Sequence, residues 1–388
     1  MYPNLYFAFK DLFGVEWPFL RFVNSFGFFV AIAFILSAIV LAAELKRKSS
    51  EGLLHPKEMQ VMVGQPATAG ELLLNFLLGF LLGFKIIALF IMDSSATEDP
   101  QAFIFSTIGS WPAGIILGLL FAGLKWYEKN KQKLPKPEKR IIRIWPQDRV
   151  GEITILALVF GLLGAKLFDI FENWSDFLKH PSSYLLSPAG LTFYGGLICA
   201  AIAIWIYAKK HDIGFWHLND AAAPTLMLAY GLGRIGCQVS GDGDWGIINT
   251  NHKPFNWLPD WMWAYNYPNN VNEAGSPIAG CVGKYCNELI PPVFPTPFYE
   301  IVICLLLFLL IWSLRKKLKT PGTLFAFYLM LNGMERFFIE KIRVNTRLDI
   351  FGFQPTQAEV ISTLLFLSGL ILWIILVKRR GTVMKSTT

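Results

Sequence analysis

The stretch GEITILALVFGLLGAKLFDIF, residues 151–171, is apolar over most of its length. As a helix that rises about 1.5 Å per residue, it would cross a bilayer core of roughly 30 Å. Eight further stretches share this character: about 26–43, 71–92, 103–124, 190–208, 219–237, 298–314, 321–338 and 358–377. The pattern predicts an all-α polytopic membrane protein with about nine transmembrane helices.

The composition agrees with this prediction. The chain has 388 residues, of which 54% are hydrophobic and 15% aromatic, and its mean hydropathy is +0.44. These values exceed what the core of a soluble protein of this length requires. The net charge of +7 therefore marks the two sides of a membrane, and we expect a lipid bilayer and no nucleic acid as the partner of the basic residues.

Basic residues gather in alternate connections between the apolar stretches: 44–48, 125–143, 208–212, 314–319 and 378–380. The connections 93–101, 172–189 and 238–297 are poorer in Lys and Arg. Because cytoplasmic loops are enriched in Lys and Arg, we expect the N-terminus outside and the C-terminus in the cytoplasm. The N-terminal segment lacks a basic region followed at once by an apolar one, so we expect the first span to be retained.

The large outer loop, residues 238–297, is rich in Trp, Tyr, Asn and Pro. Indole and phenol rings favour the level of the lipid headgroups. Two interpretations stay open for this loop: an interfacial belt, or a cap over a site that opens to the outer leaflet.

Two arginines lie near the outer ends of predicted spans, where the positive-inside rule gives no reason for a cation. Arg234 stands among glycines in GLGRIGCQVSGDGDWG, residues 231–246, and Arg336 precedes Glu340 by one helical turn. Ionisable groups at this depth are unfavourable unless they meet a partner, a water-filled cavity or a charged ligand. Since a guanidinium binds phosphate through two hydrogen bonds, we predict that both arginines bind a phospholipid phosphate, the alternative being a structural ion pair.

Four motifs carry a resemblance to a known family: GLGRIGCQVSGDGDWG, LTFYGGLI (191–198), FPTPFYE (294–300) and GMERFFIEKIR (333–343). In order and spacing, this set resembles the prolipoprotein diacylglyceryl transferases of the bacterial inner membrane. The resemblance implies transfer of a diacylglyceryl group from phosphatidylglycerol to the lipobox cysteine of a prolipoprotein, which forms a thioether and releases glycerol phosphate. It implies no cofactor.

The resemblance also implies a division of the chain. It covers the first span and then about 145–380, whereas 56–144, with two spans and a basic cytoplasmic linker, has the character of an insertion. We therefore expect an N-terminal segment with the first span at 1–55, an inserted pair of spans at 56–144, and a transferase-like membrane core at 145–388 that includes the outer loop.

The family motifs suggest roles for particular residues. Arg234 and Arg336 would bind the phosphate, and Glu340 would position Arg336. Tyr194 stands where the family has a histidine, so the general base remains open, and a packing role for Tyr194 is the alternative. Asp242 and Asp244 stand in place of a single glutamate, and which of them substitutes for it also remains open. In a glycine-rich turn, aspartates often only hydrogen-bond the backbone.

Further departures from the family pattern are Cys237 and Ser240 in place of asparagines, Asn332 in place of a tyrosine, and Phe26 before Gly27 in place of a tyrosine.

Other polar residues have simpler interpretations. Glu300 begins a span and could cap its helix. Lys166 lies in mid-span and needs a partner, for which Asp169 is suited. Cys281 and Cys286 form either a disulfide or two free thiols. The five histidines are scattered, so no metal site is predicted.

Two other function classes stay open beside the transferase. A purely structural or assembly subunit would explain the aromatic loop alone. A transporter or binding protein for an anionic lipid or solute would also place arginines in a membrane cavity. The similarity between GELLLNFLLGFLLGFK (70–85) and GEITILALVFGLLGAK (151–166) suggests a duplication, which some transporters contain. The repeat does not include the arginine motif, which weakens this alternative.

Overall fold

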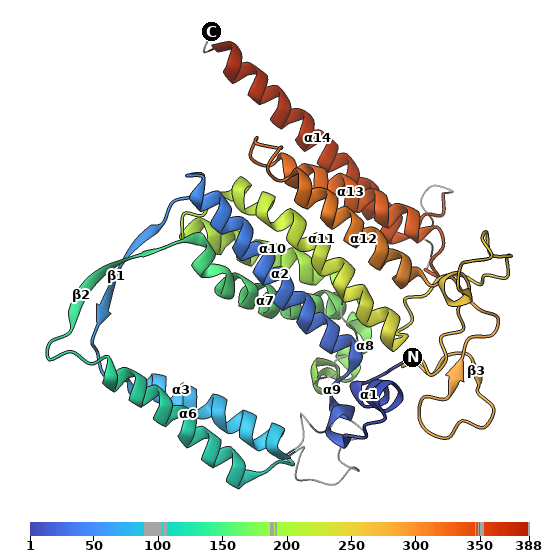
Figure 1. Cartoon of the computed structure of the whole chain (residues 1–388), viewed down its shortest axis with the longest axis horizontal. Coiled ribbons are helices and arrows are strands. Elements are labelled where there is room, and N and C mark those ends of the chain that lie inside the picture. The colour runs from blue at the N-terminus through green and yellow to red at the C-terminus, as the bar shows by residue number, and fades with distance from the viewer. Residues whose placement is uncertain are drawn as a thin grey trace. The chain divides into compact units, whose positions relative to one another are not determined.

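A computed structural model describes residues 1–88, 103, 107–186, 190, 192–345, 347, 349 and 353–386. The chain divides into two compact units. The first unit contains 1–3, 24–55 and 145–388, and the second contains 4–23 and 56–144. Most of the described chain is helical, as predicted (Figure 1).

The first unit is built almost entirely from helices. They are α2 (Ser25–Ser50), α7 (Val150–Glu172), α8 (Trp174–Lys179), α9 (Pro181–Leu186), α10 (Phe193–Lys210), α11 (Phe215–Ser240), α12 (Thr296–Leu314), α13 (Thr323–Glu340) and α14 (Gln357–Ser386), with short 3-10 turns at η4 (Pro146–Arg149) and η5 (Asp260–Met262). The pairs α7 and α10, α13 and α14, and α11 with α2 and α12 are the most extensively packed. Helix α11 therefore lies at the centre of the unit (Figure 1).

Two hydrophobic clusters flank α11. One joins Leu41 and Leu45 of α2 to Leu218 and Ala221 near the start of α11. The other joins Met227 of α11 to residues of α12 and α13, among them Cys304, Ile311 and Leu324. Burial of these apolar side chains fixes the position of α11 against its neighbours, and so fixes the polar residues at its two ends.

Helices α7 and α10 approach each other through glycines. A Cβ atom on Gly164 of α7 would lie 2.5 Å from the carbonyl oxygen of Gly195, and one on Gly195 would lie 2.3 Å from Cβ of Phe168. No larger residue fits without separating the helices. The glycines after Tyr194 therefore serve helix packing.

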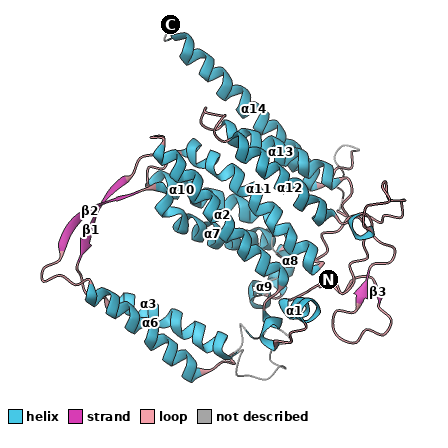
Figure 2. Ribbon diagram, in the orientation of Figure 1, coloured by secondary structure: helices cyan, strands magenta, loops and turns pink. Residues whose placement is uncertain are grey.

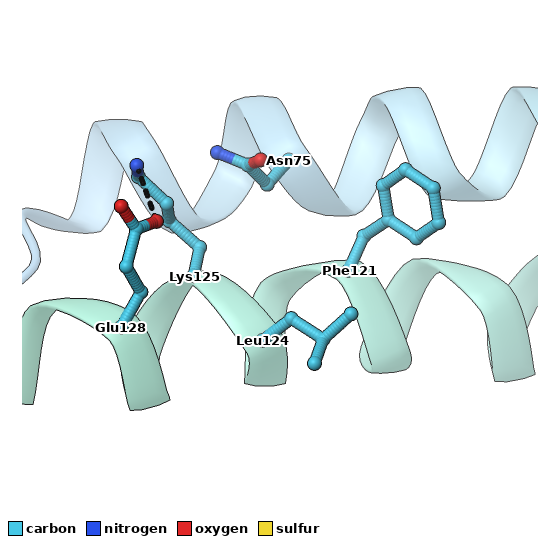
Figure 3. A pocket seen from close by; sticks show the side chains of 5 residues that line it. All are labelled: Asn75, Phe121, Leu124, Lys125 and Glu128. Carbon is cyan, nitrogen blue, oxygen red and sulfur yellow. Dashed lines mark hydrogen bonds and ion pairs between the residues drawn. The ribbon is translucent and has the colours of Figure 1, made fainter.

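The second unit contains three α-helices and a two-stranded ribbon among its described residues. Its elements are α1 (Leu5–Phe13), η1 (Pro18–Phe22), β1 (Lys57–Val63), α3 (Ala69–Leu82), a π-helical turn η2 (Gly83–Ile87), α6 (Trp111–Lys131) and β2 (Glu138–Ile144). Phe76 and Phe80 of α3 lie against Gly118 and Gly114 of α6, where there is no room for a Cβ atom. A shallow groove of about 210 Å³ between these helices is lined by Asn75, Phe121, Leu124, Lys125 and Glu128 (Figure 3).

Short antiparallel ribbons add strands to a chain predicted to be all-α (Figure 2). Strand β1 pairs with β2 from Lys57 opposite Ile144 to Val63 opposite Glu138, and β3 (Ser276–Pro277) pairs with β4 (Asn287–Glu288). The segment KEMQVMV, residues 57–63, contains β-branched valines, which are enriched in strands, but its short mixed run carries little periodic signal.

Six helical segments among the described residues are long and apolar enough to cross a membrane. They are Ser25–Ser50, Ala69–Ile87, Pro146–Glu172, Phe193–Lys210, Thr296–Leu314 and Gln357–Lys378. The chain is thus a multi-pass membrane protein. At the three remaining predicted positions, helices α6, α11 and α13 form, but they carry more polar residues, and part of the stretch predicted at 103–124 lies outside the described residues.

A buried ion cluster joins the N-terminal end of α11 to its neighbours. Glu44 of α2 pairs with Arg47 and, at 3.3 Å, with Arg315. Asp220 of α11 accepts hydrogen bonds from the backbone nitrogens of Gly322 (2.9 Å) and Phe325 (3.1 Å), and lies 3.7 Å from Nζ of Lys48. We call these residues the inner cluster.

Candidate active site

At the C-terminal end of α11, opposite the inner cluster, the ends of α11, α12 and α13 meet. Arg234 lies in the last two turns of α11, Glu300 lies one turn inside α12, and Arg336 lies in the last turns of α13. Helix α11 ends at Ser240, and the chain then turns through Gly241 (φ 65°) and Gly243 (φ 98°). These left-handed conformations are easily adopted by glycine.

Glu300 is the centre of this arrangement. Its side chain is fully buried and accepts hydrogen bonds from the Tyr230 hydroxyl (2.7 Å) and from Nη1 of Arg336 (3.1 Å). Nε of Arg234 lies 3.1 Å from Glu300 Oε2, and Nη1 of Arg343 lies 3.6 Å from Oε1. Because its partners are side chains of other segments, Glu300 is not the helix cap that the sequence suggested.

Asp244 bridges two arginines. Its two carboxylate oxygens pair with Arg234 and Arg343, and its backbone oxygen accepts a hydrogen bond from the Thr296 hydroxyl at 2.6 Å. Burial acts to raise the pKa of Asp244, but the charges of Arg234 and Arg343 outweigh it and lower the pKa below its usual value. The carboxylate is therefore held in its charged form.

Asp242 differs from Asp244 although only one residue separates them. It makes no ion pair within the described part of the chain, and its Oδ1 accepts a hydrogen bond of 3.4 Å from the backbone nitrogen of Asp244. Burial and the charge of Asp244 raise the pKa of Asp242. Of the two aspartates, Asp244 is the one that engages the arginines.

Glu340 and Tyr194 complete the group. Glu340 is buried. Its Oε2 lies 3.0 Å from Nη2 of Arg336, and its Oε1 accepts a hydrogen bond from Nδ2 of Asn345. Tyr194, at the start of α10, interacts electrostatically with Arg336, Glu340 and Arg343. All six residues chosen from the sequence thus lie in one region. We call Arg234, Arg336, Arg343, Asp244, Glu300 and Glu340 the outer cluster.

Arg343 and Tyr230 were not predicted from the sequence, and Glu300 was expected only as a helix cap. Arg343 follows Arg336 by seven residues, or two helical turns. This spacing within GMERFFIEKIR was a signal that Arg343 could lie on the same side as Arg336. Tyr230 precedes Arg234 by one turn, and the guanidinium lies 5.2 Å from the centre of its ring. No local pattern distinguishes Glu300 from a helix cap.

The other polar candidates have structural partners. Lys166 lies 3.6 Å from Asp169 and over the ring of Tyr184, and Asp169 also accepts a hydrogen bond from Asn173 (3.0 Å). Cys281 and Cys286 form a disulfide, which was one of the two interpretations of CVGKYC. Neither group is part of the outer cluster.

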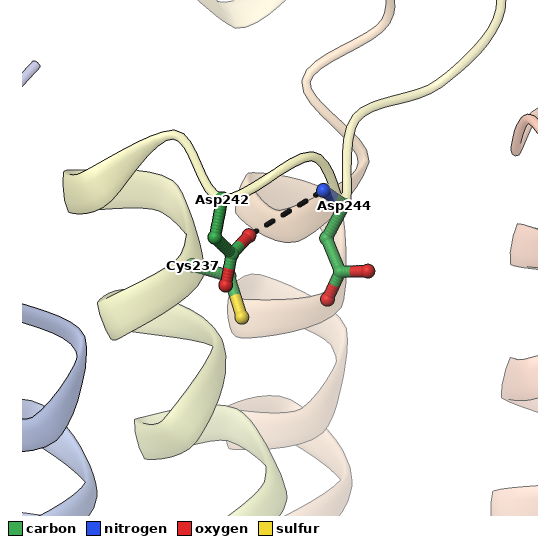
Figure 4. A group of neighbouring side chains, drawn as sticks. All are labelled: Cys237, Asp242 and Asp244. Atoms are coloured by element: carbon green, nitrogen blue, oxygen red, sulfur yellow. Dashed lines mark hydrogen bonds between the residues drawn. The ribbon is translucent and has the colours of Figure 1, made fainter. Parts of the chain in front are cut away.

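Cys237, Asp242 and Asp244 lie close enough together to suggest a cation site (Figure 4). Their ligand atoms are within 4.8 Å of one another. However, both oxygens of Asp244 already pair with arginines, and the thiol of Cys237 lies 3.8 Å from Nη1 of Arg234. A cation would have to displace two guanidinium groups, so the donor set does not favour a metal.

The loop at 238–297 has a buried part and an exposed part. Tyr267 is fully buried, its hydroxyl donates to Gln238 (2.9 Å), and its ring lies 5.3 Å from that of Trp245. Phe255 and Trp257 are exposed and stack on each other. Gly246 pairs with Arg343 through the backbone, which attaches the buried part of the loop to the outer cluster.

Comparison with known proteins identifies relatives of this chain. Residues 106–375 match the family model described as prolipoprotein diacylglyceryl transferase. A protein of Dehalococcoides mccartyi is 30% identical over 220 residues, which are 56% of this chain and 73% of the relative. One of Shouchella clausii is 27% identical over 59% and 75% of the two chains, and one of Psychrobacter arcticus is 25% identical over 72% and 94%. All three are named phosphatidylglycerol–prolipoprotein diacylglyceryl transferase.

Proposed function

This chain belongs to the prolipoprotein diacylglyceryl transferase family, and we propose that it transfers a diacylglyceryl group from phosphatidylglycerol to the lipobox cysteine of a prolipoprotein. The cysteine sulfur forms a bond to the terminal glyceryl carbon, and the bond from that carbon to the phosphate oxygen breaks. The bonding electrons leave with glycerol phosphate, and the product is a thioether.

The meeting of arginines at the outer ends of α11 and α13 is the observation that carries this proposal. Arg234 and Arg336 are 17% and 18% exposed, so their guanidinium groups are shielded but reachable. In our proposal they bind the lipid phosphate and stabilise the negative charge that grows on the departing oxygen. Glu300 and Glu340 hold the two arginines in position.

The thiol proton requires an acceptor. Glu300, Glu340 and Asp244 are each paired with arginine, which makes them weak bases. Asp242 makes no such pair in the described structure, and its pKa is raised, so it is the stronger base. We assign the proton to Asp242, and we assign to Asp244 the place of the single family glutamate. Tyr194 orients the groups around Arg336.

The arrangement in the membrane is part of the proposal. Nine spans, an outer loop at 238–297, an external N-terminus and a cytoplasmic C-terminus agree with the basic clusters, and we propose the bacterial inner membrane as the location. Segment 56–144 is an insertion in the sequence of a core formed by 1–55 and 145–388. Cysteine-accessibility labelling tests this topology: residues 260–275 should react from outside, and 130–140 only after permeabilisation.

Transfer by the purified protein tests the activity. The protein is reconstituted with phosphatidylglycerol labelled in its acyl chains and with a peptide that contains a lipobox cysteine. We expect label on the peptide and none on a matched peptide with alanine in place of that cysteine. Label that stays in the lipid, with the protein folded, would refute the transferase. The relatives support the transferase rather than a transporter of anionic solutes.

A further inference from the structure

Arg343 is a buried cation, and two of its nitrogen atoms have no hydrogen-bond acceptor among the described residues. Its side chain is 8% exposed, and its Nη2 pairs with Asp244. Its Nε and Nη1 are buried and have no hydrogen-bond acceptor among the described residues, although Nη1 lies 3.6 Å from Glu300. Buried donors without acceptors are unfavourable, so this guanidinium is prepared to receive a further acceptor.

Asp244 is the most accessible member of the outer cluster. Its side chain is 31% exposed, whereas the three arginines are 18% exposed or less. Its backbone is held by Thr296 and Asp242, so the side chain is the part that can move. With one oxygen on Arg234 and the other on Arg343, the carboxylate has the bridging geometry that two oxygens of a phosphate would adopt.

The charges of the outer cluster support an exchange. Arg234, Arg336 and Arg343 are balanced by Glu300, Glu340 and Asp244. Glu300 and Glu340 are fully buried, which leaves Asp244 as the carboxylate that can leave. Among the six residues of the outer cluster, its departure would leave three guanidinium groups and two carboxylates. This excess of one positive charge, counted without Asp242, matches the single negative charge of a phosphodiester.

We infer that Arg343 is a third phosphate-binding arginine, and that the Asp244 carboxylate occupies the place of the lipid phosphate until phosphatidylglycerol displaces it. This inference rests on the proposed function. The same carboxylate has a role after transfer. Glycerol phosphate carries more negative charge than the diester and would bind three arginines more tightly, so the return of Asp244 favours its release.

Two substitutions in the full-length protein test the inference. In the transfer assay, Arg343→Gln should raise KM for phosphatidylglycerol about tenfold, because charge-assisted hydrogen bonds are lost. Lys341→Gln removes an exposed cation two residues away, and should change KM by less than about twofold.

In calorimetric titration, Asp244→Asn should lower Kd for glycerol phosphate about fivefold, since the amide competes without charge. Asp260→Asn, in an exposed pair of the outer loop, should leave Kd unchanged.

The outcomes separate this inference from the proposed function. An unchanged KM in Arg343→Gln, or weaker glycerol phosphate binding in Asp244→Asn, would overturn the inference while wild-type transfer persists. If Arg343→Gln does not fold, KM for phosphatidylglycerol is measured for Arg343→Lys instead. The Asp244→Asn titration then tests the same inference by binding. Wild-type affinity for inorganic phosphate equal to that for glycerol phosphate would overturn the assignment to a lipid headgroup. Absence of wild-type transfer would refute the proposed function, whereas the titrations still report on the site.

Discussion

The two buried ion clusters lie at opposite ends of α11 and are built from the same chemistry, yet their partners differ. In the inner cluster, the carboxylates of Glu44 and Asp220 connect cations of α2 with backbone groups at the start of α13. In the outer cluster, Glu300 faces three arginines, and Arg343 keeps two donor atoms without an acceptor in the described structure.

This difference distinguishes a structural cluster from a binding site. Backbone hydrogen bonds to Asp220 belong to the fold, so no ligand can replace them without unfolding a helix start. In the outer cluster, by contrast, the accessible bridge is a single side chain on a loop. We therefore expect substitutions in the inner cluster to reduce stability, and substitutions in the outer cluster to reduce activity.

The largest effect is expected for Arg234. Arg234→Ala should reduce transfer by roughly 10³-fold, because the cation that stabilises the departing phosphate is lost. Arg234→Lys should recover little, since a point charge cannot replace the two-pronged guanidinium. Turnover is measured with labelled lipid, and the melting temperature serves as the control for folding. Near-normal turnover of a folded Arg234→Ala variant would remove Arg234 from the site.

Glu44 should show the opposite response. Glu44→Gln removes the buried carboxylate that pairs with two partly buried arginines, Arg47 and Arg315, and should lower the free energy of unfolding by about 3 kcal/mol. Glu51→Gln removes the exposed partner of Arg47, and should cost less than about 1 kcal/mol. Thermal unfolding in detergent measures both. A stable Glu44→Gln variant with impaired transfer would mean that the inner cluster is not purely structural.

Asp242 should change the pH dependence. As the base, it must be ionised, so activity should fall as the pH falls through its pKa, which is raised above the ordinary value near ~4. Asp242→Asn should lower the rate roughly tenfold at neutral pH, because a thiol with a pKa near ~8.5 is still partly ionised. In the Asp242→Asn variant, the acidic limb of the pH–rate profile should shift to higher pH, toward that thiol pKa. An unshifted profile would exclude Asp242 as the acceptor.

Tyr194 should have the smallest effect. Tyr194→Phe keeps the ring beside Arg336 and removes only the hydroxyl, so transfer should fall by less than about threefold. The rate is measured together with binding of phosphatidylglycerol. Loss of transfer with lipid binding retained would show that the hydroxyl takes part in the reaction and that Asp242 is not the base.

The sequence by itself determined the features that depend on local periodicity and composition. Apolar stretches such as 151–171 predicted a multi-pass helical protein, because a bilayer accepts only segments whose backbone is satisfied internally. The motif around Arg234 indicated the family, and the spacing of Arg336 and Glu340 predicted their ion pair, since residues four apart share a helix face. The ribbon of β1 and β2 was not predicted, because short mixed segments carry little periodic signal.

Only the tertiary structure decided which distant residues meet. Arg343 and Asp244 are 99 positions apart, and Arg336 and Glu300 are 36 apart, so that no local pattern links them. Their contacts depend on how α11, α12 and α13 pack and on the turn at Gly241 and Gly243. The same turn places Asp244 rather than Asp242 between the arginines. A side chain's partners are set by the packing of whole helices, because buried apolar surface, rather than the polar groups themselves, fixes where the helices lie.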